Sequence, residues 1–350
     1  MKKITLPFLF LTLVIALQSC KEPKKVYTIP TTYNFSNANY STSTARVNMI
    51  TAFVTEVRKG TTATLDAAWL KNLYSNTNNP YPNDTLNLNT SGVQLKDQTL
   101  LTQQSVLEAW LDGAATSSLS NGTTATSGNP GVLTNGTSKY LVDATGKEYK
   151  EAVEKGCQGA LIYYQITAVL LSDNQVGSGV AIGDRQRHWD EAFGYYAVPV
   201  DYPTNTSGLK HVGKYCNDRN ALLNNGTATM NAFLKGRAAI NNDDNEVVTE
   251  QVAIIRDNIE RGWAGTALHY INGALANMAN DGARHHNLSE GYFIVKSLKY
   301  NPTKKASDAQ VDQLLALFGD NFYNTTTVDL QAAKDLLSTI YGFDAVKDQL

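Results

Sequence analysis

The chain has 350 residues, and its 30 Lys and Arg nearly balance its 32 Asp and Glu, for a formal net charge of −2 at pH 7. Only 18% of the residues are charged, so the chain has no basic field of the kind that binds nucleic acid, and nucleic acid is excluded as a partner. With 42% hydrophobic residues, this length can bury one large core or two modest ones.

The first twenty residues have the features of a bacterial export signal. Lys2 and Lys3 supply the positive end, an apolar run follows over residues 6–17, and Cys20 closes the segment. The run is too short to span a membrane. The closing Leu-Gln-Ser-Cys is similar to the lipobox of bacterial lipoproteins, which implies cleavage before Cys20 and lipid attachment to its thiol. We expect an exported protein, lipid-anchored to the outer membrane on its periplasmic or cell-surface face.

The rest of the chain divides into a tether and a helical body. Residues 21–45 are polar without a lasting period, which predicts a flexible tether. Residues 46–350 show apolar spacing typical of helices. The predicted helices lie at about 46–60, 65–74, 97–119, 148–173, around His188 as far as Pro199, 219–241, 246–280, around 286–290 as far as Pro302, 307–318 and 328–341. The predicted fold class is all-α, with antiparallel helices joined mostly by short loops.

One low-complexity segment, 121–146, interrupts this pattern with Gly, Thr, Ser and Asn. Its Asn-Gly pairs predict either a mobile loop or a short β-hairpin. Such an insert can be a flap over a site or a tolerated surface excursion, and the sequence does not choose between them.

Two stretches of the body resemble each other. Residues 154–159, Glu-Lys-Gly-Cys-Gln-Gly, have a counterpart in residues 260–265, Glu-Arg-Gly-Trp-Ala-Gly. Each is followed by a segment that carries His and Glu. We interpret this as an internal duplication of a helix hairpin over about 148–199 and 254–299, and we expect the two hairpins to be related by a pseudo-twofold axis.

Each predicted hairpin carries one pair of metal-ligand residue types. His188 and Glu191 are three residues apart and His286 and Glu290 are four apart, and both spacings place the two side chains on one helix face. Helical bundles build metal sites from inward His and Glu on facing helices. If the hairpins face each other, these four residues form one metal site.

Mixed imidazole and carboxylate ligands suit several transition metals, of which we favour iron, with zinc or copper as alternatives. Three other residues of the repeats are candidates for supporting the ligands: Asp190, His269 and His285. Of the neighbouring histidines, His286 is favoured over His285 as the partner of Glu290, because only a four-residue spacing keeps a common face. His211 is expected in a loop as an ordinary surface residue.

Signatures of common enzyme classes are missing from the sequence. There is no H-E-x-x-H zinc-protease motif, no G-x-S-x-G elbow, no Walker loop and no dinucleotide fingerprint. We therefore favour binding over catalysis.

The lipobox, the duplicated helical body and the motif His188-Trp189-Asp190-Glu191 together resemble the imelysin-like family of exported bacterial lipoproteins, in an uncharacterised branch. The resemblance extends over most of the exported chain in architecture, while its motifs lie within 154–196 and 260–298. It implies two helical-bundle halves, a G-x-H-x-x-E signature and a link to uptake of iron or other metals, and a peptidase label attaches to the family. His188 and Glu191 match the signature, whereas its glycine is Gln186 here.

The favoured function is a membrane-anchored lipoprotein that binds a transition metal or a small metal-containing ligand for uptake, with a transporter as partner. Two alternatives stay open. One is a metallopeptidase with its metal at His188 and Glu191 and with Glu290 or Asp190 as the general base. The other is a non-catalytic structural or interaction module in which the His/Glu pairs hold helices together.

Overall fold

The computed structural model describes residues 25–350 and confirms the all-α class. The predicted signal segment and Cys20 lie outside the described residues. Within the described range, no helix combines the length and the apolar character needed to cross a membrane.

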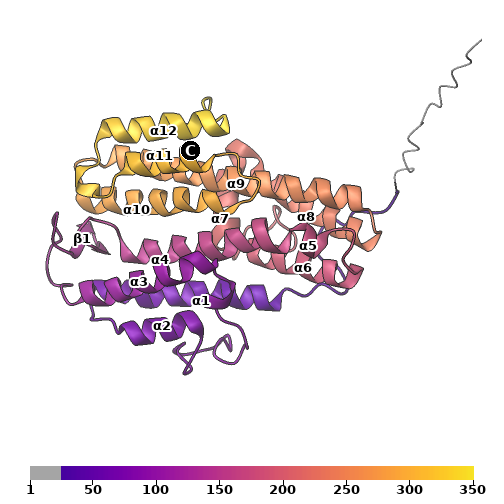
Figure 1. The fold of residues 1–350 in the computed structure, drawn as a ribbon, viewed down its shortest axis with the longest axis horizontal. Helices are drawn as coiled ribbons and strands as arrows, with labels where there is room; N and C mark the ends of the chain where they lie inside the picture. Colours follow the sequence, from indigo (N-terminus) through magenta and orange to yellow (C-terminus); the bar gives the residue numbers. More distant parts are fainter. Residues whose placement is uncertain (1–24) are drawn as a thin grey trace, which may run out of the picture.

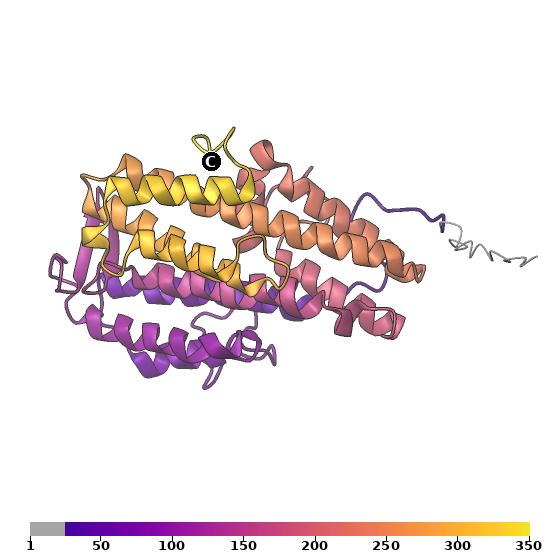
Figure 2. The ribbon, with the colours of Figure 1, turned by 45° about the horizontal axis from the view of Figure 1, so that its top comes forward.

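Twelve α-helices make up the described body, which is elongated (Figure 1). In chain order they are α1 (Ser41–Arg58), α2 (Ala67–Ser75), α3 (Leu101–Ser118), α4 (Tyr149–Cys157), α5 (Asp173–Val176), α6 (Ile182–Tyr196), α7 (His211–Leu223), α8 (Asn225–Asn241), α9 (Asn245–Ala276), α10 (Asp281–Ser297), α11 (Asp308–Phe318) and α12 (Thr327–Tyr341). Helices α1 to α3 form one side of the body, and α11 and α12 form the opposite side, above α9 and α10 (Figures 1 and 2).

Two long central elements hold these layers together. One is α9, which packs against α7, α8, α10 and α12. The other is α4, which continues as two π-helical stretches, η3 (Gln158–Tyr163) and η4 (Gln165–Leu170), and packs against α1, α3 and α10. The apolar core is continuous along both elements. Because α4 also packs against α10, these two helices face each other inside the bundle.

Local sequence signals explain several helix boundaries. The Asp244 side chain accepts a hydrogen bond from the backbone N–H of Val247 and so caps α9. Capping boxes start α11 at Ser307 and α12 at Thr326.

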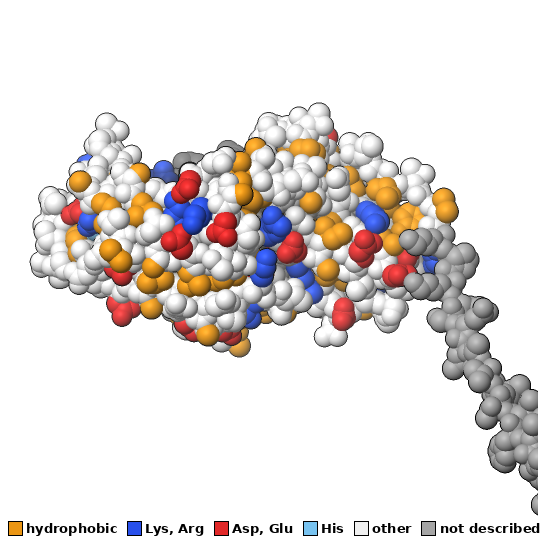
Figure 3. All heavy atoms as spheres, turned by 90° about the horizontal axis from the view of Figure 1, so that it is seen from above, with side chains coloured by type: hydrophobic (Ala, Val, Ile, Leu, Met, Phe, Trp, Pro, Cys, Tyr) orange, Lys and Arg blue, Asp and Glu red, His pale blue; other side chains and the backbone are white. Residues whose placement is uncertain are grey.

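On the face seen from above, charged side chains of both signs are mixed with apolar ones (Figure 3).

The low-complexity insert contains a β-hairpin of β1 (Gly131–Asn135) and β2 (Ser138–Val142). Asn135 pairs with Ser138 across the two-residue turn Gly136-Thr137, and Gly136 has φ +58°, the positive φ that a type II′ turn requires at its first central residue. The hairpin is not a free excursion, because β1 and β2 both contact α10.

The segment predicted as a flexible tether, 21–45, differs from that prediction over its described part. Tyr33 is buried, stacks on Phe193 with ring centroids 3.7 Å apart, and donates its backbone N–H to the carbonyl of Val200. Helix α1 already begins at Ser41. The aromatic residues of this segment bury enough apolar surface to fix it to the body. The mostly polar composition of the segment did not predict this attachment.

The helix predicted over 219–241 is also different, because it is two helices. Asn224 adopts a left-handed conformation with φ +52°, which ends α7 and turns the chain into α8. Helix α7 begins earlier than predicted, at His211.

The two segments of the proposed duplication correspond to α4, η3, η4, α5 and α6, and to α9 and α10. Their glycines serve close packing. A side chain at Gly159 would collide with Ser297 of α10, and one at Gly262 would collide with Asn225 of α8. The two glycine pairs therefore face different partners, and the pseudo-twofold relation stays a prediction.

Candidate functional site

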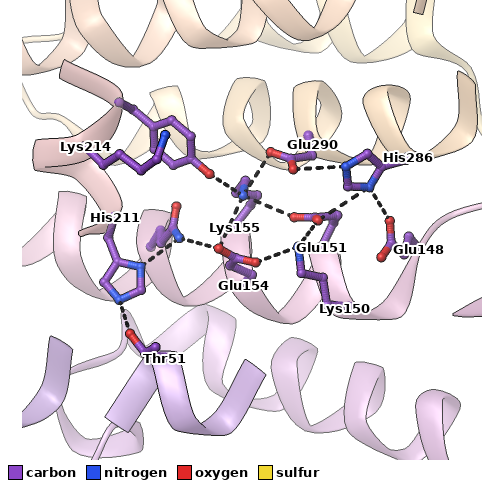
Figure 4. Close-up of polar contacts among 12 residues, drawn as sticks. Thr51, Glu148, Lys150, Glu151, Glu154, Lys155, His211, Lys214, His286 and Glu290 are labelled. Atoms are coloured by element: carbon purple, nitrogen blue, oxygen red, sulfur yellow. Dashed lines mark hydrogen bonds and ion pairs between the residues drawn. The ribbon is translucent and has the colours of Figure 1, made fainter. Parts of the chain in front are cut away.

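A buried cluster of charged side chains lies where α4 faces α10 (Figure 4). Glu151 and Lys155 are four residues apart on α4, so they share one face, and Glu148 stands immediately before the helix. Helix α10 presents His286 and Glu290 to that face with the same spacing. The close approach at Gly159 and Ser297 brings the two helices near enough for these side chains to meet.

His286 is the centre of the acidic half of this cluster. Its Nδ1 lies 2.7 Å from Oε2 of Glu148 and 3.6 Å from Oε1 of Glu151. Its Nε2 lies 3.5 Å from Oε1 of Glu290. Glu148, Glu151 and His286 each offer one ligand atom, and these atoms lie within 4.8 Å of one another. Ligand atoms about 2.0–2.2 Å from a common ion lie at most about 4.4 Å apart, so a small contraction would suffice to hold a metal.

Two lysines compensate the carboxylates. Nζ of Lys155, 1% exposed, lies 3.1 Å from Oε2 of Glu151 and 2.9 Å from Oε2 of Glu290, and it donates a 2.6 Å hydrogen bond to the hydroxyl of Tyr215. Lys150 pairs with Glu151 and with Glu154. Buried charges are tolerated only when they are paired in this way.

The cluster shifts the proton affinities of its members. Burial disfavours the charged form of His286, but the hydrogen bond to Glu148 and the surrounding carboxylates outweigh it and raise its pKa to about 9. Burial and the charge of Glu151 raise the pKa of Glu290 to about 7. Burial also works against ionised Glu151, but Lys155 and Lys150 hold the pKa of that carboxyl below its ordinary range. The cluster therefore holds protons near neutral pH that a bound cation would displace.

A cavity of about 600 Å³ connects the cluster with solvent. Its floor contains Glu148, His286 and Glu290, and its walls come from the end of α1, from the short turn η1 (Lys59–Thr61) and from β2. Tyr140 of β2 stacks on the ring of His286, with centroids 4.6 Å apart and planes at 20°. The β-hairpin thus covers one side of the site, as expected of a flap.

The structure does not bring the two predicted His/Glu pairs together. His286 and Glu290 are in the cluster, whereas His188 and Glu191 lie on α6, which packs against α1, α5 and α8. Nδ1 of His188 lies 3.0 Å from the carbonyl of Gln175, and Glu191 lies 3.6 Å from the guanidinium of Arg187. Helical spacing placed His286 and Glu290 on one face correctly, but it did not show which neighbours that face meets.

The three residues predicted to support the ligands do not contact the ligand atoms of the cluster. Asp190 is buried and pairs with Arg237 at 2.8 Å. His285 is buried against Tyr323, and burial lowers its pKa to about 4. His269 is on the exposed side of α9.

His211 corrects the expectation of a surface residue in a loop. It is the first residue of α7 and is buried. Its Nε2 lies 3.0 Å from the carbonyl of Val47, which can only accept, so Nε2 carries the proton. Nδ1 accepts from the amide of Gln158 at 3.0 Å, and the same amide also reaches Glu154 at 3.1 Å (Figure 4). The ion cluster is linked to α1 through these contacts.

We expect His211 to make folding stability depend on pH. Burial lowers its pKa in the folded protein, so between the folded and unfolded pKa values the unfolded chain binds more protons and stability falls as pH falls. Below the unfolded pKa of about 6.5 the loss is at most about 1.4 kcal/mol per pH unit. Urea unfolding at pH 7.5 and 5.5 should show a loss about 1 kcal/mol larger for the native chain than for His211→Gln. Equal losses in the two proteins would contradict this role.

Sequence reasoning missed four members of the cluster: Glu148, Lys150, Glu151 and Lys155. A signal was present, because residues 147–155 contain six charged side chains in a chain that is otherwise poor in them. What the sequence could not show is that this segment faces α10, which lies more than a hundred residues later.

Comparison with known proteins places the chain in a family. A model of the family described as Domain of unknown function (DUF4856) matches residues 30–343. The chain therefore belongs to this family, whose match includes all twelve helices of the body. No curated protein and no solved structure matches the chain.

Proposed function

We propose that the protein binds a transition-metal ion, iron by preference, at His286, Glu148 and Glu151, as an exported lipoprotein that serves metal uptake. The observation that carries this proposal is the convergence of three ligand atoms within 4.8 Å, with two of the three residues, Glu148 and His286, at the floor of a cavity open to solvent. One imidazole with two carboxylates suits iron, zinc and manganese. Glu290, 3.5 Å from the histidine, is placed to join them or to accept the released proton.

The resemblance to the imelysin-like lipoproteins supports the part of the proposal that concerns export and metal uptake. It rests on the lipobox ending at Cys20 and on the motif 188–191, and it implies export, a lipid anchor in the outer membrane and a transporter partner. In our proposal, His188 and Glu191 of that motif belong to the fold around α6, and the metal is held elsewhere. No specific contact favours the peptidase alternative at His188 and Glu191.

His286→Gln is the variant that tests the site. It removes the only nitrogen ligand while keeping a polar side chain of similar length, and we expect metal affinity to fall at least about 100-fold. Calorimetric titration of iron(II) under nitrogen and of zinc(II), with elemental analysis of the dialysed protein, would measure this. The matched control is His188→Gln, which should bind as the native chain does.

Two outcomes would count against the proposal. A native chain that binds no metal more tightly than about millimolar, roughly −4 kcal/mol, would leave the cluster as a structural ion network. Equal affinity in the native chain and His286→Gln would place the metal elsewhere.

A further inference from the structure

The cavity above His286 is much larger than a metal ion needs. Its volume is about 600 Å³, whereas one water molecule occupies about 30 Å³ in the liquid. Sites for small organic molecules typically have about 300–1,000 Å³. Under the proposed function, the cavity has room for a metal ion together with an organic ligand that carries it.

The walls of the cavity indicate the charge of that ligand. Arg58 at the end of α1 and Lys139 on β2 both line it, and neither has an ion-pair partner among residues 25–350. Lys150 adds a third cation at the edge of the floor. Hydroxyl side chains stand between these cations: Thr61, Thr62, Thr137 and Ser138. Free guanidinium and ammonium groups beside hydroxyls are donors suited to the oxygens of an anion.

The charges around the floor of the cavity also favour an anionic ligand. Of the carboxylates around His286, Glu151 pairs with Lys150 and Lys155 and Glu290 pairs with Lys155, so within the described part of the chain only Glu148 has no lysine partner. A bare cation would therefore have to approach Glu148 past the positive side chains of Arg58, Lys139 and Lys150. A metal that arrives with its own anionic ligand avoids this repulsion, because the ligand charge is complementary to the walls.

From this arrangement we infer that the ligand is the complex of a metal ion with a small polycarboxylate. The metal is held by Glu148, Glu151 and His286, and the remaining carboxylates of the chelator are held by Arg58 and Lys139. The guanidinium of Arg58 can bind a carboxylate through two parallel hydrogen bonds, which Lys139 cannot. The inference rests on the proposed function and specifies the form in which the metal is recognised.

Equilibrium dialysis of the full chain against iron(III) citrate, with iron and citrate both counted, tests the inference. We expect the native chain to retain iron and citrate together, and to retain iron-free citrate or inorganic phosphate much more weakly. Arg58→Gln and Lys139→Gln should each weaken retention of the complex on the order of tenfold. Neither should weaken binding of iron(II) alone, because each substitution removes a positive charge from the walls. Lys59→Gln is the matched control, because Lys59 is adjacent to Arg58 but pairs with Glu56 and is not among the residues that line the cavity.

The outcomes separate the inference from the proposed function. If the Arg58 and Lys139 variants retain the complex like the native chain, while iron(II) binding still depends on His286, the inference fails and the metal site stands. If citrate or phosphate without metal is retained as tightly as the complex, and His286→Gln changes nothing, the site is an anion site. The proposed function and the inferred complex then both fail. Exposed positions such as Arg58 and Lys139 carry little folding cost, and thermal unfolding of each variant would verify that.

Discussion

Lys155→Met should cost about 3–5 kcal/mol of folding free energy, because it removes one partner of a buried ion cluster. The Lys155 side chain is 1% exposed, and two of the three carboxylates that it pairs with, Glu151 and Glu290, are 0% and 7% exposed. Methionine fills a similar volume without charge, so the loss would come from the uncompensated carboxylates and not from a void. Urea unfolding followed by circular dichroism would give the change in unfolding free energy.

A surface lysine provides the control for this prediction. Lys235 pairs with Glu250 at 3.2 Å with both side chains well exposed, and Lys235→Met should cost less than about 1 kcal/mol. Adding Glu290→Gln to Lys155→Met should recover part of the loss, since it neutralises Glu290, whose only lysine partner among residues 25–350 is Lys155. A cost for Lys155→Met no larger than that of the surface variant would mean that the cluster does not stabilise the fold.

Helical periodicity predicted most of the fold. It fails where the signal is a single residue, as at Asn224, whose left-handed conformation splits one predicted helix into α7 and α8. The prediction from periodicity fails again over residues 27–40. The polar composition of this segment predicted a flexible tether, but its aromatic side chains attach it to the body. The first case depends on the backbone conformation of one residue and the second on packing against the distant helix α6, and periodicity contains neither kind of information.

The candidate site was predictable only in part for the same reason. The spacing of His286 and Glu290 showed that they share a helix face, and the contact between them is present in the structure. It could not show that this face meets Glu148 and Glu151 instead of the hairpin of His188. Which helices face each other is set by close contacts such as that between Gly159 and Ser297.

Among residues 188–191, Asp190 is the residue whose substitution should lower folding stability most. The sequence indicated it only as a candidate for supporting the metal ligands. Its Oδ1 accepts a 2.8 Å hydrogen bond from Nε of Arg237 and a 2.7 Å bond from the hydroxyl of Tyr33, and both partners are buried. Its Oδ2 lies 3.3 Å from the backbone N–H of Asn39. Asp190 thus links α6, α8 and the segment before α1.

We expect Asp190→Ala to lower the unfolding free energy by about 3–5 kcal/mol, since it leaves the guanidinium of Arg237 buried without its carboxylate. The same variant should release residues 27–40, which hydrogen exchange would detect as lost protection of the Tyr33 amide. Glu191→Ala, one residue later on the same helix, should change stability by no more than about 0.5 kcal/mol, because that side chain is partly exposed and its one ion pair among the described residues is the 3.6 Å contact with Arg187. If the two substitutions cost the same, or if the Tyr33 amide stays protected in Asp190→Ala, the buried ion pair does not hold the N-terminal segment in place.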